Sequence, residues 1–177
     1  IFIIGAYTGL RYSDYSNLQN EDFEKINNEI YLNKTIRKTN DIVSIPILPK
    51  VKKVFDKYTI NGVINLPKSI SNQKFNQYLK EVGKLIPELN KPFAMNRTTG
   101  GLKTSVNKPK WQLLVTHTAR RSFATNMYLR GISPNSIMGV TGHKTESSFY
   151  TYIQMNPKQK AVQFMNEFNN SKVKLMA

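Results

Sequence analysis

Six side chains of this sequence have the types needed to work on a phosphodiester without a metal ion. Two arginines can clamp phosphate oxygens, two histidines and a lysine can hold or move protons, and a tyrosine can supply a nucleophile. They lie in four short segments, which read TGLRYSD, RKTNDIVSIPI, HTARRSFAT and TGHKTESSFYTYI. In chain order the six residues are Arg11, Lys38, His117, Arg120, His143 and Tyr152.

The segment HTARR places His117 and Arg120 three residues apart at the expected start of a helix. Side chains at this spacing project from one face of a helix. A helix N-terminus offers free N–H groups and partial positive charge, which favour a bound phosphate. Arginine can grip two phosphate oxygens at once. Taken alone, the spacing is more typical of a capped surface helix that carries an arginine pair.

Two tyrosines compete for the role of nucleophile, because Tyr150 and Tyr152 both follow His143 closely. We expect both on a helix that starts at Thr145 and Glu146. Two residues along a helix correspond to a rotation of about 200°. The two rings therefore cannot share a face, and only one of them can meet the phosphate.

The charge of the chain indicates a polyanionic partner. Lys and Arg number 26 against 11 acidic residues, which gives a formal net charge of +15. Residues 91–177 contain only two acids, Glu146 and Glu167, so most of the excess lies in that half. Such an excess is most simply explained by nucleic acid. A lysine-rich proteome would produce a similar bias, and composition leaves DNA, RNA and an anionic membrane open.

Length and composition are those of a globular protein with one domain of 177 residues. No apolar run approaches a membrane span and no secretory signal is visible, so we expect a cytoplasmic protein without a membrane partner. The chain has no cysteine, which excludes disulfides and Cys-based zinc sites. The acidic residues are scattered without a D-x-D pair, and we expect no metal site. Because the chain begins with Ile1 inside an apolar segment, we interpret it as a fragment of a longer protein.

The first half of the sequence predicts helices around one β-hairpin. The hairpin signal is the alternation in residues 29–36 and 42–48, with turn formers in Lys38–Asp41 between them. Residues 1–7 are expected to form a helix that ends near Gly9. A short helix follows, capped by Ser13, with Asp14 in its first turn, and runs toward Leu18. Two further helices are expected from Pro49 to Tyr58 and, capped by Ser71, to Leu85. Gly100 and Gly101 are expected in a loop or at a hairpin tip.

The C-terminal third predicts four helices. The first is capped by Thr116 and ends at Gly131, and the second begins at Ser133-Pro134 and ends near Gly139. The third begins at Thr145 with Glu146, and the last begins at Asn156-Pro157. The last helix is apolar at Ala161, Val162, Met165 and Phe168. The fold class expected from these elements is mainly α with a small antiparallel β-sheet (α+β).

In this order, the four segments resemble the catalytic domain of the tyrosine recombinases, the phage integrase family, over about residues 1–170. TGLR followed by a serine and an acid is similar to the family's first-arginine box. The family places its catalytic lysine at a hairpin tip, with a proline eight residues later. Lys38 and Pro46 match this spacing, and Lys34 and Arg37 are the competing cations. Gly142-His143 matches the second histidine position. The nucleophile follows nine residues later, which selects Tyr152 over Tyr150.

The resemblance implies DNA cutting and rejoining through a 3′-phosphotyrosyl bond on Tyr152, without metal, ATP or another cofactor. Arg11, Arg120 and His143 would stabilise the charge of the transition state. Lys38 would protonate the 5′-oxygen leaving group, and His117 would accept the tyrosine proton or orient the phosphate. Asp14, the acidic residue of the first-arginine box, would hold the side chain of Arg11 in position without touching the phosphate itself.

The family's partners are double-stranded DNA and further copies of the recombinase. On DNA we expect a tetrameric synapse, with accessory DNA-bending or directionality proteins as possible partners, and in free solution a monomer. We assign further DNA contacts to Arg37, Arg121 and Lys144. Residues 1–177 would form the catalytic domain without the family's N-terminal core-binding domain, and residues 157–177 its C-terminal helix and tail. The GHKTE segment and the Asn/Lys-rich composition are similar to integrases of Bacteroides-type mobile elements.

Two other functions are compatible with the same residues. A type IB topoisomerase uses the same chemistry to relax DNA without assembling a synapse. A non-catalytic DNA-binding domain could keep the fold and lose the activity, although the six intact residues argue against this.

Overall fold

The computed structural model describes residues 1–99, 102–153 and 155–175. The chain divides into a larger unit, formed by Ile1–Lys68 together with Ala119–Ala177, and a smaller unit, Ser69–Thr118. Helix α5 (Thr116–Leu129) begins in the smaller unit and continues into the larger one. The predicted loop at Gly100 and Gly101 lies outside the described residues.

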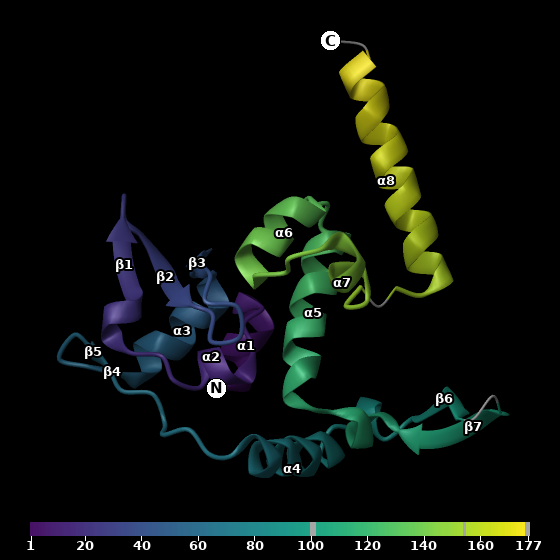
Figure 1. Cartoon of the computed structure of the whole chain (residues 1–177), viewed down its shortest axis with the longest axis horizontal. Helices are drawn as coiled ribbons and strands as arrows, with labels where there is room; N and C mark the ends of the chain where they lie inside the picture. Colours follow the sequence, from purple (N-terminus) through teal and green to yellow (C-terminus); the bar gives the residue numbers. More distant parts are fainter. Residues whose placement is uncertain (100–101, 154, 176–177) are drawn as a thin grey trace. The chain divides into compact units, whose positions relative to one another are not determined.

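The first part of the larger unit packs short helices against a three-stranded antiparallel sheet of order β1-β2-β3 (Figure 1). Its elements are α1 (Phe2–Thr8), α2 (Tyr12–Tyr15), the 3-10 turn η1 (Asn20–Asp22), β1 (Phe23–Ile26), β2 (Glu29–Thr35), β3 (Ile42–Pro46), α3 (Pro49–Tyr58), β4 (Thr59–Ile60) and β5 (Val63–Ile64). The predicted hairpin is confirmed as β2 and β3, with Leu32 opposite Ile45. The proline at the first position of α3 explains why that helix begins as predicted.

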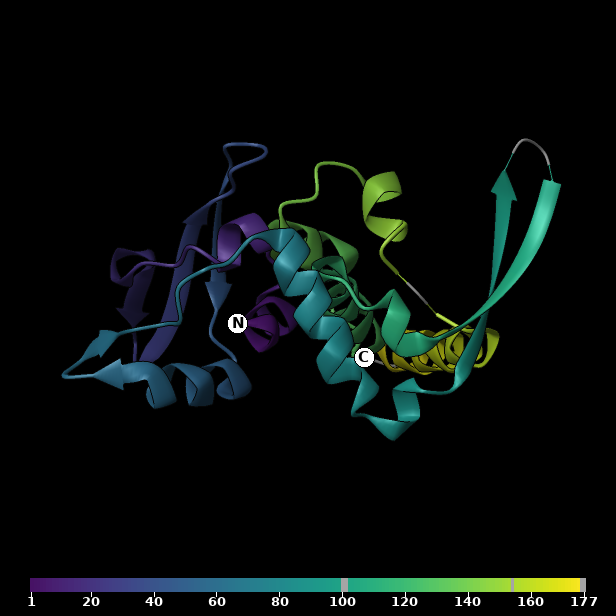
Figure 2. The same ribbon diagram turned by 90° about the horizontal axis from the view of Figure 1, so that it is seen from below.

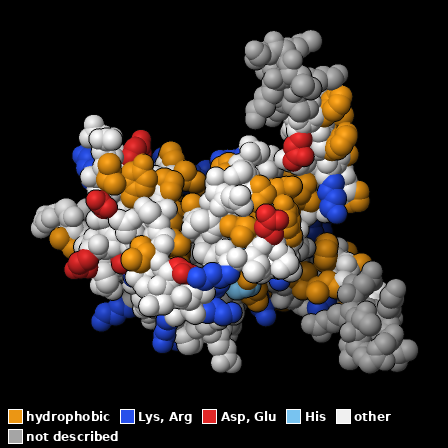
Figure 3. Space-filling view, turned by 45° about the horizontal axis from the view of Figure 1, so that its top comes forward, with side chains coloured by type: hydrophobic (Ala, Val, Ile, Leu, Met, Phe, Trp, Pro, Cys, Tyr) orange, Lys and Arg blue, Asp and Glu red, His pale blue; other side chains and the backbone are white. Residues whose placement is uncertain are grey.

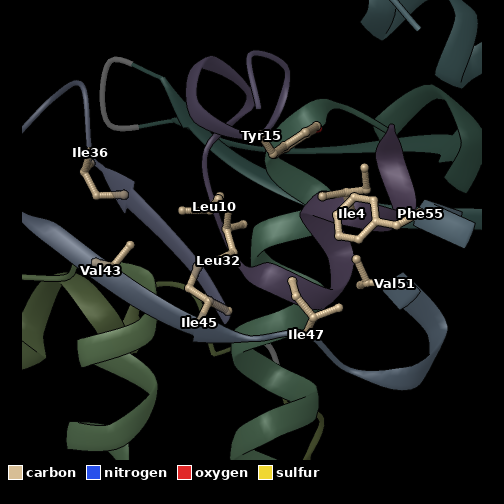
Figure 4. Close-up of a cluster of buried hydrophobic side chains, with 10 residues drawn as sticks. All are labelled: Ile4, Leu10, Tyr15, Leu32, Ile36, Val43, Ile45, Ile47, Val51 and Phe55. Atoms are coloured by element: carbon tan, nitrogen blue, oxygen red, sulfur yellow. The ribbon is translucent and has the colours of Figure 1, made fainter. Parts of the chain in front are cut away.

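The main core lies between this sheet and helices α1 and α3. Strand β3 alternates between exposed and buried residues, and its buried Val43 and Ile45 face the helices. Figure 4 shows the buried side chains of this core converging from both layers. They are Ile4, Leu10, Tyr15, Leu32, Ile36, Val43, Ile45, Ile47, Val51 and Phe55.

The remainder of the larger unit is helical and has its own buried cluster. Its helices after α5 are α6 (Pro134–Thr141), α7 (Glu146–Tyr150) and α8 (Pro157–Leu175). The cluster combines α5, α6 and α7 through Phe123, Ala124, Met127, Ile137 and Phe149. Ser133 caps α6 as predicted, because its Oγ accepts a hydrogen bond from the Ser136 N–H at 3.2 Å.

The smaller unit consists of a helix, a long hairpin and two 3-10 turns. Its elements are α4 (Asn72–Lys84), η2 (Pro87–Leu89), β6 (Pro92–Thr99), β7 (Leu102–Pro109) and η3 (Lys110–Leu113). Ser71 caps α4 as predicted, by accepting from the Lys74 N–H. A Cβ at Gly83 would lie 2.6 Å from Leu114 and 2.9 Å from Trp111, so this glycine lets η3 approach α4 closely. Figure 2 shows β6 and β7 as an extended two-stranded ribbon.

Several predicted boundaries are corrected by the structure. Helix α2 is capped by Arg11 instead of Ser13 and ends at Tyr15 instead of Leu18. Helix α6 passes Gly139 and ends at Thr141, because the left-handed residue that closes it is Gly142, with φ 67°. Thr116 is the first residue of α5 and not its cap.

The fold class is confirmed as mainly α with small antiparallel sheets, although the sequence predicted only one sheet. No helix in the described part of the chain is long and apolar enough to cross a membrane.

Candidate active site

Arg120 is the centre of the candidate site and is almost completely buried, with 1% of its surface exposed. Its Nη1 donates to the carbonyl oxygens of Gly9 and Thr141, each at 2.7 Å. Its Nη2 lies 3.1 Å from the Nε2 atom of His143. The guanidinium therefore joins the end of α1 to the end of α6, and its orientation is fixed by the fold before any ligand binds.

The carbonyl oxygen of Gly9 reaches Arg120 only because the backbone turns sharply at this position and passes close to its neighbours. It ends α1 with φ 70°, a left-handed conformation that side chains rarely adopt. A Cβ at this position would lie 2.5 Å from Phe123 and 2.7 Å from Thr141. The glycine of the TGLR segment therefore serves Arg120, which lies 111 residues away, as well as the adjacent Arg11.

His143 is held between Arg120 and Thr141 just after the left-handed cap of α6. The Thr141 hydroxyl donates to the Ile137 carbonyl at 2.7 Å and lies 2.6 Å from His143 Nδ1. Because that hydroxyl hydrogen is used, we assign the imidazole proton to Nδ1, which donates to Thr141 Oγ1. Nε2 then accepts from Arg120, and it is the ring nitrogen nearest the guanidinium.

Tyr152, and not Tyr150, lies beside these residues. Its ring centroid is 4.7 Å from that of His143 and 5.5 Å from the guanidinium carbon of Arg120. The ring of Tyr150 instead packs edge-on against Tyr128 at 6.3 Å and is 45% exposed. Helix α7 ends at Tyr150, so Tyr152 lies in the turn after it and not on the helix as predicted. The two rings still point to different surroundings.

Arg11 contributes a second guanidinium close to the first. Burial and the charge of Arg11 lower the pKa of Arg120 to about 10, while Tyr152 and Asp14 oppose this shift. Arg120 remains protonated near neutral pH, so two positive charges face each other there. Arg11 Nη1 and Arg120 Nε are buried without an acceptor in the described part of the chain. A phosphate between the two guanidiniums would supply acceptors and relieve their repulsion.

Asp14 is buried and holds the hairpin turn. Its Oδ1 accepts from the backbone N–H of Arg37 at 3.1 Å and from Ser13 Oγ at 3.3 Å. One of its hydrogen bonds thus goes to the segment that carries Lys38, and the predicted role of Asp14 behind Arg11 stays a prediction. The side chain of Arg37 is exposed.

Lys38 lies in the exposed turn between β2 and β3. The turn is closed by Ile36, whose N–H donates to the Asp41 carbonyl at 2.8 Å, and by Asn40 with φ 58°. The competing Lys34 is bound to Asp22 at 2.6 Å, and only 17% of its side chain is exposed. Lys34 is thus engaged by Asp22, whereas Lys38 and Arg37 are both exposed, and the choice of Lys38 stays a prediction.

The predicted DNA contacts have different surroundings. Lys144, the residue after His143, forms an ion pair of 2.6 Å with Asp41 and thereby ties its own segment to the Lys38 turn. Arg121 is exposed on α5. Sequence reasoning missed Asp41, Thr141 and the carbonyl of Gly9, because none of them carries a side-chain signal of its own.

His117 lies in the first turn of α5, three residues before Arg120. It belongs to the smaller unit, so its role at the site remains a prediction from the sequence. In the described residues, no three His, Cys, Asp or Glu side chains are grouped as a metal ion would require.

The geometry brings together two guanidiniums, an imidazole and a tyrosine ring in one partly buried cluster. Solved structures of recombinases and integrases have the same fold. The XerA recombinase has a TM-score of 0.64 and 17% identity over 93% of this chain and 56% of that chain. The Tn1549 transposon integrase in complex with circular intermediate DNA has a TM-score of 0.55 and 19% identity, over 93% and 55% of the two chains.

A third similar structure, the XerH recombinase bound to its difH substrate before cleavage, has a TM-score of 0.57 and 12% identity over 90% and 43% of the two chains. This chain thus spans about half the length of the solved chains it resembles. A comparison with curated protein sequences finds no significant match.

The fold is therefore that of a tyrosine recombinase catalytic domain, as predicted. The model of the phage integrase family matches residues 1–159, and the chain belongs to that family.

Proposed function

We propose that this chain is the catalytic part of a site-specific DNA recombinase that cuts and rejoins DNA through a phosphotyrosine. The observation that carries the proposal is the position of the Tyr152 ring beside Arg120 and His143. A tyrosine hydroxyl close to a preorganised pair of guanidiniums is the arrangement that nucleophilic attack on a phosphodiester requires. The comparison structures with DNA agree with duplex DNA as the substrate.

Each side chain takes one role in the proposed reaction. The Tyr152 oxygen attacks the scissile phosphorus and becomes bonded to the 3′-phosphate, while the 5′-oxygen leaves. Arg11 and Arg120 stabilise the additional negative charge of the transition state. Lys38 gives its proton to the leaving 5′-oxygen, and His117 takes the proton of Tyr152 or orients the phosphate. No ATP is required, because the phosphotyrosyl bond conserves the energy of the broken one. The two arginines supply the positive charge for which metal nucleases use a cation.

His143 is proposed to change partner when DNA binds. Without DNA its Nε2 accepts from Arg120. When a phosphate binds, Arg120 keeps its hydrogen bonds to Gly9 and Thr141 and directs Nη2 to a phosphate oxygen. Nε2 of His143 then takes up a second proton from solvent and donates to the same phosphate. The Thr141 hydroxyl, which hydrogen-bonds to Nδ1, holds the ring plane during this change.

The decisive experiment is covalent trapping on a nicked suicide DNA, followed by peptide mass mapping of the attached tyrosine. Wild-type protein is expected to form the adduct on Tyr152. Tyr152→Phe removes only the hydroxyl and should abolish the adduct while DNA binding is retained. Tyr150→Phe is the matched control and should form the adduct normally. An adduct that survives in Tyr152→Phe and disappears in Tyr150→Phe would show that the other ring is the nucleophile.

The same assay separates the two competing functions. A covalent adduct contradicts a domain that only binds DNA. Strand transfer between two duplexes contradicts simple relaxation by a topoisomerase, which does not need to pair them. Finding neither adduct nor transfer on any nicked duplex would overturn the recombinase proposal.

We also propose that helix α8 docks on another copy of the chain when a tetramer assembles on DNA. Figure 3 shows hydrophobic side chains exposed along this helix. Phe164 is 66% exposed, and Val162 and Met165 are each about half exposed, whereas Gln163 is buried. An apolar stripe of this kind on a surface helix is typical of a contact with a partner. The +15 charge opposes self-association away from DNA, so we expect a monomer in free solution.

Phe164→Glu tests this docking. The variant should keep adduct formation on a single nicked site and lose at least ten-fold in recombination of paired sites, because the exposed ring contributes only to assembly. Deletion after Asn156 should have the same effect. Loss of single-site adduct formation in both variants would place α8 in the core of its own unit and contradict docking on a neighbour.

A further inference from the structure

The β6–β7 ribbon of the smaller unit contains no residue used in the proposed reaction, yet it is the longest hairpin described in the chain. Its two strands of eight residues pair from Pro92 opposite Pro109 to Thr99 opposite Leu102. At about 3.3 Å per residue the paired strands extend about 23 Å. The ribbon is therefore as long as about seven base pairs of B-DNA, whose rise is about 3.4 Å per base pair on each strand.

The two faces of the ribbon differ in chemistry. One face carries the cross-strand pair Met95 and Val106, and both residues are partly buried. Together with Trp111 and Lys108 they line a cavity of about 440 Å³ at the base of the ribbon. This face is therefore directed toward η3 of its own unit.

The opposite face is exposed and made of small and polar residues. Ala94 pairs with Asn107 on it, and Ser105 lies on the same side of β7, two positions before Asn107. Asn and Ser are side-chain types that hydrogen-bond to base edges, and Ala suits the thymine methyl group. These three residues include no large apolar side chain, so this part of the face is poorly suited to bury against protein.

Charge favours nucleic acid as the partner. The smaller unit contains eight Lys and Arg residues but only two acids, Glu81 and Glu88. Neither acid is on the ribbon, and the sequence has no further acid until Glu146. The ribbon therefore carries no carboxylate that would repel a phosphate backbone.

We infer that the face with Ala94, Ser105 and Asn107 enters the major groove of duplex DNA and reads base sequence there. The major groove admits a two-stranded β-ribbon, and strands are an established means of groove readout. The assignment to a sequence-reading role rests on the proposed recombinase function, which requires selection of a DNA site. The rival occupant is a second copy of the chain, since Phe93 near the base of the ribbon is 47% exposed.

The first test locates the partner by photo-crosslinking. A photoreactive phenylalanine analogue replaces Asn107 in one variant and Gln73 in a control, since Gln73 is exposed on α4 of the same unit. Each protein is irradiated with the nicked duplex used for trapping. We expect crosslinks from position 107 to bases, at least ten-fold above those from position 73. Crosslinks from position 107 to a second protein chain, or none to DNA, would overturn the inference.

The same irradiated sample also shows whether the Tyr152 adduct forms. The recombinase function and the role of the ribbon are therefore tested separately. An adduct without a crosslink contradicts the ribbon assignment and leaves the recombinase function intact. A crosslink without an adduct contradicts the function and leaves the ribbon as a DNA-binding surface.

The second test asks whether the ribbon reads sequence. Wild-type protein and the double variant Ser105→Ala with Asn107→Ala select duplexes from a randomised pool, and Gln73→Ala is the matched control. A good base contact is worth about 1–3 kcal/mol of discrimination, so the double variant should lose roughly five-fold or more of its preference at two to four adjacent base pairs. Both side chains are exposed, so the fold should tolerate the changes. An unchanged preference at every position would contradict base reading by this face.

Discussion

Arg120 and Lys38 occupy opposite kinds of environment in the same unit. Arg120 is buried and bonded to two backbone carbonyls from distant parts of the chain. Lys38 stands in an exposed turn, which is held to the rest of the unit by the hydrogen bond that the Arg37 backbone N–H donates to Asp14 and by the ion pair between Asp41 and Lys144. The groups that would stabilise charge are thus fixed by the core, whereas the group that would donate a proton depends on two local tethers.

The largest expected effect is at the buried end of this comparison. Arg120→Ala and Arg11→Ala should each slow adduct formation by about 10²-fold or more, since each removes a preorganised positive charge from the transition state. Lys at either position should rescue poorly because it lacks the bidentate fork. Single-turnover trapping on nicked DNA measures both, with the exposed Arg130→Ala as the control. Adduct formation at nearly the wild-type rate by Arg120→Lys would contradict the clamp.

Gly9→Ala tests whether the fold around Arg120 is as constrained as the structure indicates. A side chain at φ 70° and within 3 Å of Phe123 and Thr141 should lower the free energy of unfolding by on the order of 3 kcal/mol. Gly131→Ala is the matched control, because Gly131 has φ 79° with open space around it and should lose only about 1 kcal/mol. Urea denaturation compares the two. Equal losses would mean that the close approach at Gly9 is easily relieved.

Lys38→Ala should reduce adduct formation on ordinary DNA by about 10²-fold, as for loss of a general acid. A substrate with sulfur at the 5′ leaving position needs little protonation, so on it the variant should cleave almost as fast as wild type. The sulfur substrate should not rescue Arg11→Ala. If Lys38→Ala stays slow on sulfur, or if Arg37→Ala shows the rescue instead, the general acid is not Lys38.

The smallest effect is expected at the tether. Asp41→Asn should slow cleavage at most a few-fold, because an exposed ion pair contributes little and salt screens it. The ion pair with Lys144 holds the pKa of Asp41 below its usual value, so the carboxylate stays charged as the pH falls into the ordinary Asp range. The cleavage rates of Asp41→Asn, Lys144→Ala and the variant that combines both changes measure the coupling between the two residues. A strictly additive double variant would show that the two residues do not act together.

The sequence predicted the elements whose boundaries are marked by local signals. Pro49, Ser71 and Ser133-Pro134 begin α3, α4 and α6 as expected, because prolines and capping hydroxyls act within one turn of the helix. Strand β1 was missed, since its four residues carry little alternation. The signal that could have found it is the Asn27-Asn28 turn before β2, where both residues have positive φ.

The candidate site was predicted in its residue types but not in its connections. The order and spacing of the four segments selected Tyr152, and its ring does lie beside Arg120, although the helix expected to carry it ends at Tyr150. The contacts of Gly9, Thr141 and Asp41 join positions 21 to 111 residues apart. Such pairings depend on the tertiary fold, and a single sequence contains no local pattern that specifies them.

The hydrogen bond from Arg120 to the Gly9 carbonyl has a consequence for how the chain acquires its activity. The two residues are separated by 111 positions, so the contact forms only after a long loop has closed and both halves of the larger unit have folded. During synthesis a ribosome-bound chain that has reached Tyr152 still lacks an oriented guanidinium until α1 and α5 meet. Under the proposed function, a nascent or misfolded copy would therefore leave DNA uncut, and the ability to form the phosphotyrosine arises only with completed folding.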